Sequence, residues 1–126
     1  MTSFSTKALE DDVHAAAVHV FELGKAGPDG VTVAAKAEHI LATTGRAPSI
    51  LDGPEMPEEA QRAWGWFLDL HTARPSGYGL SPIAWSDLLA YLSLSGIQAT
   101  AWELRLLRTI DRAFLEVNAP PLPSKD

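Results

Sequence analysis

The sequence predicts an all-α protein of about five helices. Apolar side chains recur at helical spacing in five segments, and Gly and Pro residues separate those segments. The short β-branched run Val31-Thr32-Val33 could form a strand, but the rest of the sequence offers no partner strand for it. The helices are expected at about residues 7–23, 32–44, 58–73, 85–95 and 100–118.

The first two expected helices form an Ala-rich N-terminal segment. In the first, Leu9, Val13 and Val20 recur at helical spacing, and Gly24 is a stop signal after it. The second ends at Gly45. The stretch that follows contains three Pro residues, so we interpret it as a linker.

The other three expected helices have stronger signals. Pro57 and the two Glu residues after it suit the start of the third helix, where Trp64 and Phe67 begin an apolar stripe. The fifth helix opens with a capping box. In this motif the Thr100 hydroxyl and the Glu103 carboxylate each satisfy a free N–H group of the first turn.

The distribution of aromatic residues divides the chain. Eight of the ten aromatic residues, including all four Trp, lie after residue 56. Because aromatic side chains carry large apolar area, the densest core is expected in an aromatic-rich C-terminal three-helix unit. We therefore expect an N-terminal helical segment (residues 1–53), a C-terminal helical domain (residues 54–118) and a flexible Pro-rich tail (residues 119–126).

The composition argues against several classes of protein. The net charge of the 126-residue chain is -6, and an acidic chain is repelled by the phosphates of nucleic acid. No apolar run approaches the ~20 residues that span a bilayer, and the polar, acidic start does not resemble a signal peptide. Because Cys is absent, disulfides and cysteine nucleophiles are excluded.

No motif for catalysis, cofactor binding or metal binding is visible. His14 and His19 are five residues apart, whereas a metal-binding pair on a helix needs a spacing of three or four. The sequence has no Gly-rich phosphate loop and no Gly-x-Ser-x-Gly elbow. Pairs of acidic residues lie at helix starts, where capping explains them. We expect no enzyme, no cofactor and no metal.

A helix-turn-helix remains an alternative for residues 86–110. Two helices would meet near Gly96, and Arg105, Arg108 and Arg112 would face DNA. The acidic residues interleaved with these arginines oppose that interpretation. A helical hairpin with a solvated charged face explains the same pattern.

The four Trp residues cannot all be buried in a helical unit of about 65 residues. Exposed aromatic side chains are favoured at protein interfaces, so one or two of them are candidates for partner binding. Trp102, just inside the capping box, is expected to be a buried anchor between the last two helices.

A long pattern of uncommon residues runs through the C-terminal half. It includes Trp64-Gly65-Trp66-Phe67, Gly77-Tyr78-Gly79, Pro82-Ile83-Ala84-Trp85, Leu94-Ser95-Gly96 and Trp102-Glu103-Leu104. Over about residues 54–118 this pattern resembles the phage tail assembly chaperones, small proteins encoded among the tail genes of tailed phages and prophages. Ala84 departs from the pattern, since such sequences often carry Ser or Thr at that place.

The resemblance implies a non-catalytic role in tail assembly. Chaperones of this kind bind the tape measure protein, a very long helical protein, and keep it soluble in the host bacterial cytoplasm while tail tube subunits polymerise. The expected partner is therefore the tape measure protein or another phage tail protein. Whether the protein also forms a homo-oligomer stays open. The alternative is a small acidic phage protein that inhibits a host protein or acts as its adaptor.

The expected partner site lies around the breaker-rich loop at residues 74–82. Tyr78 lies between two Gly residues at the loop tip and is free to project. Trp66 and Trp85 flank the loop on the third and fourth helices, and Arg74 follows the third helix. A folded-back Tyr78 that covers one of these Trp rings is the competing interpretation.

Overall fold

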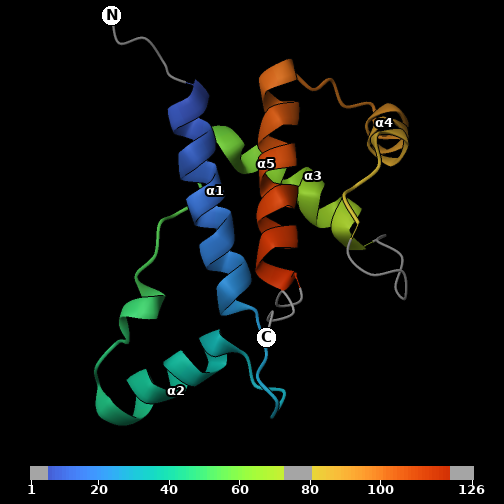
Figure 1. Cartoon of the computed structure of the whole chain (residues 1–126). Coiled ribbons are helices and arrows are strands. Elements are labelled where there is room, and N and C mark those ends of the chain that lie inside the picture. The colour runs from blue at the N-terminus through green and yellow to red at the C-terminus, as the bar shows by residue number, and fades with distance from the viewer. Residues whose placement is uncertain (1–5, 73–80, 120–126) are drawn as a thin grey trace, which may run out of the picture.

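The computed structural model describes residues 6–72 and 81–119, and within them it is all-α, as predicted (Figure 1). Only one isolated β-bridge, between Ala26 and Thr32, occurs in these residues. The five α-helices and two short 3-10 helices are α1 (Thr6–Leu23), α2 (Val33–Thr44), η1 (Ser49–Leu51), η2 (Glu58–Ala60), α3 (Gln61–Thr72), α4 (Trp85–Leu94) and α5 (Ala101–Asn118).

The core lies between α1, α3 and α5. In Figure 1, α1 runs alongside α5 and α3 crosses behind α5, and both α1 and α3 contact α5. Each helix places one apolar stripe in this core, as its spacing predicts. Buried core residues from the three helices include Leu9, Val13, Ala17, Ala63, Phe67, Leu70, Leu106, Leu107, Ile110 and Ala113.

The division of the chain at residue 53 stays a prediction, but the structure shows that α1 is part of the core. Val13 and Ala17 of α1 are fully buried, and α1 packs along α5. The expectation that the densest core lies in the C-terminal three helices omitted this packing. The physical reason is that α1 presents small residues such as Ala16 and Ala17, which bury apolar area without the large side chains that mark a core in the sequence.

A cluster of aromatic rings fills the core at one end of α1. The ring of Phe67 lies 5.5 Å from Phe21, 5.8 Å from Trp64 and 6.1 Å from Phe114, measured between centroids. The His71 ring stacks on Phe67 at 5.3 Å. The rings come from α1, α3 and α5, so this cluster joins the three core helices.

The predicted capping box at the start of α5 is confirmed. The Thr100 hydroxyl accepts from the Glu103 backbone N–H, and the Glu103 carboxylate accepts from the Thr100 backbone N–H at 3.1 Å. The Glu103 side chain is buried, and Arg62 of α3 pairs with it at 3.2 Å between Nη1 and Oε2. The same carboxylate therefore caps α5 and ties it to α3.

The second expected helix forms α2, which lies across the end of α1 in Figure 1. Thr32 caps its start, and Gly45, at a φ of 74°, ends it in the left-handed conformation that glycine adopts readily. The linker that follows contains the short helix η1. It passes so close to α1 that a Cβ added to Gly53 would lie 2.1 Å from Nε2 of His19.

The expectation that Trp102 is a buried anchor is wrong. Its side chain is 38% exposed. It stands at the second position of α5, which begins at Ala101. The expected flexible tail falls almost wholly outside the described residues.

Candidate protein-binding surface on α4

The predicted partner site is only partly described by the structure. Arg74 and Tyr78 lie outside the described residues. Trp66 is 7% exposed and faces the core, with the Arg62 guanidinium over its ring at 5.0 Å. Trp85, the first residue of α4, is 61% exposed. Of the four candidates, Trp85 is therefore the described residue that presents its ring to the surface.

Polar contacts fasten the start of α4 to α5. The backbone N–H of Ile83 donates to Oδ2 of the buried Asp111 at 2.9 Å, and Nη1 of Arg108 donates to the carbonyl of Ile83. Ala84 is the N-cap residue of α4 and gives no side-chain cap. The side chains of α5 thus hold the chain where it enters α4.

Arg108 also supports the ring of Trp85. Its guanidinium carbon lies 3.9 Å from the centroid of the indole, which is a favourable cation–π geometry. Burial lowers the pKa of the Arg108 guanidinium, and the nearby Asp111 carboxylate opposes that shift. Because a hydrogen bond to the Ile83 carbonyl holds the Arg108 guanidinium in place, the exposed indole packs against a group of fixed position.

A second polar contact holds α4 near its other end. The Tyr91 hydroxyl donates to Oδ2 of Asp69 on α3 at 2.6 Å. Burial and this hydrogen bond raise the pKa of Tyr91 to about 12. Between the two anchor points, Leu88 is the buried residue of α4.

The solvent side of α4 carries one charged residue, Asp87, and is otherwise built of apolar and small side chains. Trp85, Leu89 and Leu94 are 61%, 67% and 89% exposed. Three small exposed residues lie between them, and the spacing of all six places them on one side of the helix. We call this surface the outer face of α4; it consists of Trp85, Ser86, Leu89, Ala90, Ser93 and Leu94.

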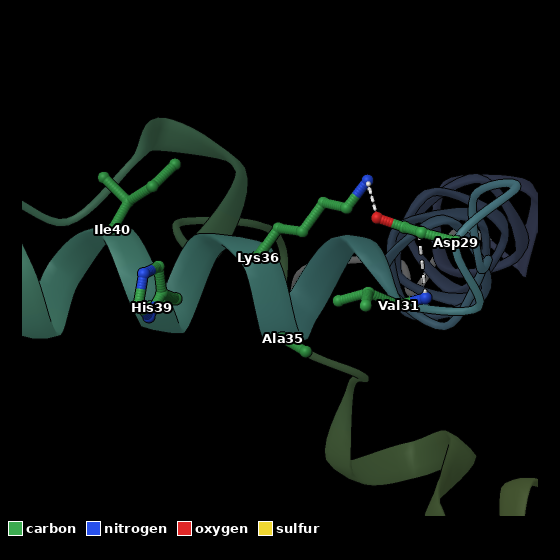
Figure 2. Close-up of a pocket in the computed structure, with 6 residues that line it drawn as sticks. All are labelled: Asp29, Val31, Ala35, Lys36, His39 and Ile40. Carbon is green, nitrogen blue, oxygen red and sulfur yellow. Dashed lines mark hydrogen bonds and ion pairs between the residues drawn. The ribbon is translucent and has the colours of Figure 1, made fainter.

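An apolar hollow of about 400 Å³ lies along α2 and the turn before it (Figure 2). Figure 2 shows Lys36 reaching toward Asp29, and the two form an ion pair at 3.3 Å. The Val31 N–H, together with Lys36, lowers the pKa of Asp29. With these charges paired, Ala35 and Ile40 continue the apolar lining. The hollow contains none of the predicted site residues.

A family model described as phage tail assembly chaperone matches residues 40–116, which is more than half of the chain. The chain belongs to the phage tail assembly chaperone family. The matched residues include all of α3 and α4 and therefore the whole outer face, whereas α1 lies outside them. Neither the curated proteins nor the solved structures gave a match.

Family membership supports a role in tail assembly and implies interaction with other phage tail proteins. This chaperone family is generally non-catalytic. Among the described residues, no group of His, Asp and Glu side chains could hold a metal ion. No described helix is long and apolar enough to cross a membrane.

Sequence reasoning missed Leu89 and Leu94 as candidate surface residues. The available signal was the composition of α4, whose ten residues include only one charged side chain, Asp87. A helix that is apolar all round is normally buried. In this structure α4 leaves its outer face open instead.

Proposed function

We propose that this chaperone binds the tape measure protein of its phage in the host cytoplasm, before that protein is enclosed in the tail tube. The family match supports a role in tail assembly, and the outer face of α4 provides a surface for a helical partner. No catalytic step is part of the proposal. The chaperone acts by covering apolar surface.

The observation that carries the proposal is the exposed apolar outer face within the family-matched residues. An amphipathic helix can lay its apolar stripe against such a surface, with anchor side chains on successive turns. Trp85 is pre-positioned by Arg108, and a rigid aromatic anchor loses little conformational entropy on binding. Such a contact would keep the apolar stripe of the partner away from other copies of the same partner.

The helix-turn-helix alternative receives no support from the arginine side chains. Arg108 is turned toward Ile83 and Trp85, and Arg112 pairs with Glu116 at 3.6 Å. Arg105 is exposed, and within the described residues it is the one of the three that makes no such contact. A host protein as partner would use the same outer face, so the experiment must compare partners directly.

The proposal is tested by co-expressing the tagged chaperone with the tape measure protein encoded in the same tail gene cluster. The informative variant is Leu89→Asp, which places a charge at the centre of the outer face. Leu68→Asp is the matched control, because Leu68 is also an exposed leucine, at 44%, but lies on α3.

We expect wild type and Leu68→Asp to capture the tape measure protein, and Leu89→Asp to capture at least about tenfold less, equivalent to 1.4 kcal/mol. Circular dichroism checks that both variants are folded. Failure of the wild-type chaperone to capture the tape measure protein would refute the proposed partner. Equal capture by all three proteins would instead refute the outer face as the binding surface.

A further inference from the structure

The outer face of α4 is unusual for a solvent-exposed helix surface. The chain carries 26 charged residues, 10 basic and 16 acidic, yet none of the six residues of this face is charged. Its three large side chains are 61% to 89% exposed. Contiguous exposed apolar residues of this kind mark surfaces that another molecule covers.

The order of residues on this face is nearly symmetric. If two copies of α4 pack antiparallel about a two-fold axis between Leu89 and Ala90, Trp85 of one copy lies opposite Leu94 of the other. In the same register Ser86 lies opposite Ser93, and Leu89 lies opposite Ala90. Small residues in the middle permit close approach of the helices, and large apolar residues meet at both ends. A two-fold interface requires this kind of self-complementarity.

The charge distribution also favours a second copy as the occupant. Two chains of net charge -6 repel each other, so they can meet only where acidic residues are sparse. The six residues of the outer face provide such a place, although the exposed Asp87, the one charged residue of α4, lies at its edge beside Leu94. A basic partner recognised through charge would require acidic side chains within the face, and the face has none.

We propose that the chaperone forms a reversible homodimer through antiparallel packing of the outer faces of α4. The helix has ten residues and so is about 15 Å long. One face of this length covers far less than the roughly 800 Å² per partner of a stable interface. The dimer is therefore weak, with a dissociation constant in the micromolar range or above.

Because the dimer is weak, it can regulate binding of the tape measure protein; this consequence rests on the proposed function. The dimer covers the same face that the tape measure protein would occupy. The two associations compete, so a helix of the tape measure protein, the client of the chaperone, must displace the second copy. The dimer itself does not depend on the identity of the client and is measured on the purified chaperone alone.

Sedimentation velocity over roughly 1 μM to 1 mM tests the dimer directly. Wild type and the control Leu68→Asp should shift from the 13.6 kDa monomer toward twice that mass as concentration rises. Leu89→Asp should raise the dissociation constant at least about tenfold. A wild type that stays monomeric throughout overturns the inference and leaves the client-capture result unaffected.

A cross-linking experiment tests the antiparallel register. Because the chain has no Cys, a single introduced thiol reports one position without interference. Ala90→Cys lies next to the proposed two-fold axis and should form a disulfide-linked dimer under mild oxidation, whereas Leu68→Cys should form far less. Equal cross-linking at both positions would show random collision and would overturn the proposed interface.

Discussion

Replacing Phe67 with Ala tests the packing of the core. The Phe67 side chain is fully buried, and its ring lies within 6.1 Å, between centroids, of those of Phe21, Trp64, His71 and Phe114. Truncation removes the ring on which contacts from α1, α3 and α5 converge. The surrounding rings are rigid and belong to three different helices, so they cannot collapse into the space.

The expected loss of unfolding free energy is about 3–5 kcal/mol, the range for buried Phe→Ala substitutions. The upper half of that range is expected, because aromatic pairs contribute about 0.5–1.5 kcal/mol beyond their buried area. A domain of this size is stable by roughly 5–15 kcal/mol in total. Urea unfolding followed by circular dichroism should therefore show a much lower midpoint with an unchanged slope.

Trp102→Ala provides the comparison. Trp is the larger side chain, but Trp102 is 38% exposed, so we expect its removal to cost less than about 2 kcal/mol. The reasoning fails if Trp102→Ala destabilises the chaperone as much as Phe67→Ala does. That result would mean that residue size, and not the burial seen in the structure, determines the loss.

Three further predictions concern contacts between elements. Gly53→Ala should lower the melting temperature, because its Cβ would lie 2.1 Å from Nε2 of His19, and adding His19→Ala should recover part of the loss. The folded-state pKa of Tyr91, about 12, lies above its ordinary value of 10.0, so stability should fall as pH rises from about 10 to about 12. Tyr91→Phe should remove that part of the pH dependence, and an ultraviolet titration of both proteins locates the transition. Asp111→Ala leaves the buried Ile83 N–H unpaired, at a cost of about 1–3 kcal/mol. Hydrogen exchange should then accelerate in α4 more than in α1; an equal rise in both helices would contradict a local role for Asp111.

The helices themselves were largely predictable from local patterns. The capping box at Thr100 and the apolar stripe after it located α5 to within a residue. Pro57 was expected at the first position of α3, but the structure places the 3-10 helix η2 there and begins α3 at Gln61. Such a difference at a helix start is small, because one turn of either helix satisfies the same free backbone groups.

The arrangement of the helices was less predictable. A stripe such as that of α1 shows that a face is buried, but not which other helix covers it. The aromatic pattern places the core in the C-terminal half and does not show that α1 packs on α5, where α1 buries Val13, Ala16 and Ala17. Small residues leave a weak signal in composition, although they determine how closely two helices approach.

At the candidate site, the sequence pattern likewise does not predict which individual residues are exposed. Trp66 and Trp85 are equivalent in residue type and both flank the loop, yet one is buried and the other is exposed. The sequence pattern also gives no sign that Arg108, interpreted as part of a solvated charged face, contacts one of these rings. In the structure its side chain turns toward Ile83 and supports the Trp85 ring, a tertiary contact that helical spacing cannot indicate.

The way α4 is attached explains how its apolar face can stay open. A helix held only by apolar packing would turn its largest apolar residues inward. Here the Asp111 contact to the Ile83 backbone and the Tyr91 contact to Asp69 fix the helix at both ends, and Leu88 fills the space between them. Polar contacts thus set the orientation of α4, so its apolar residues are not all required for folding. The outer face is then available for association that is reversible, because no folded-state contact has to break when one occupant replaces another.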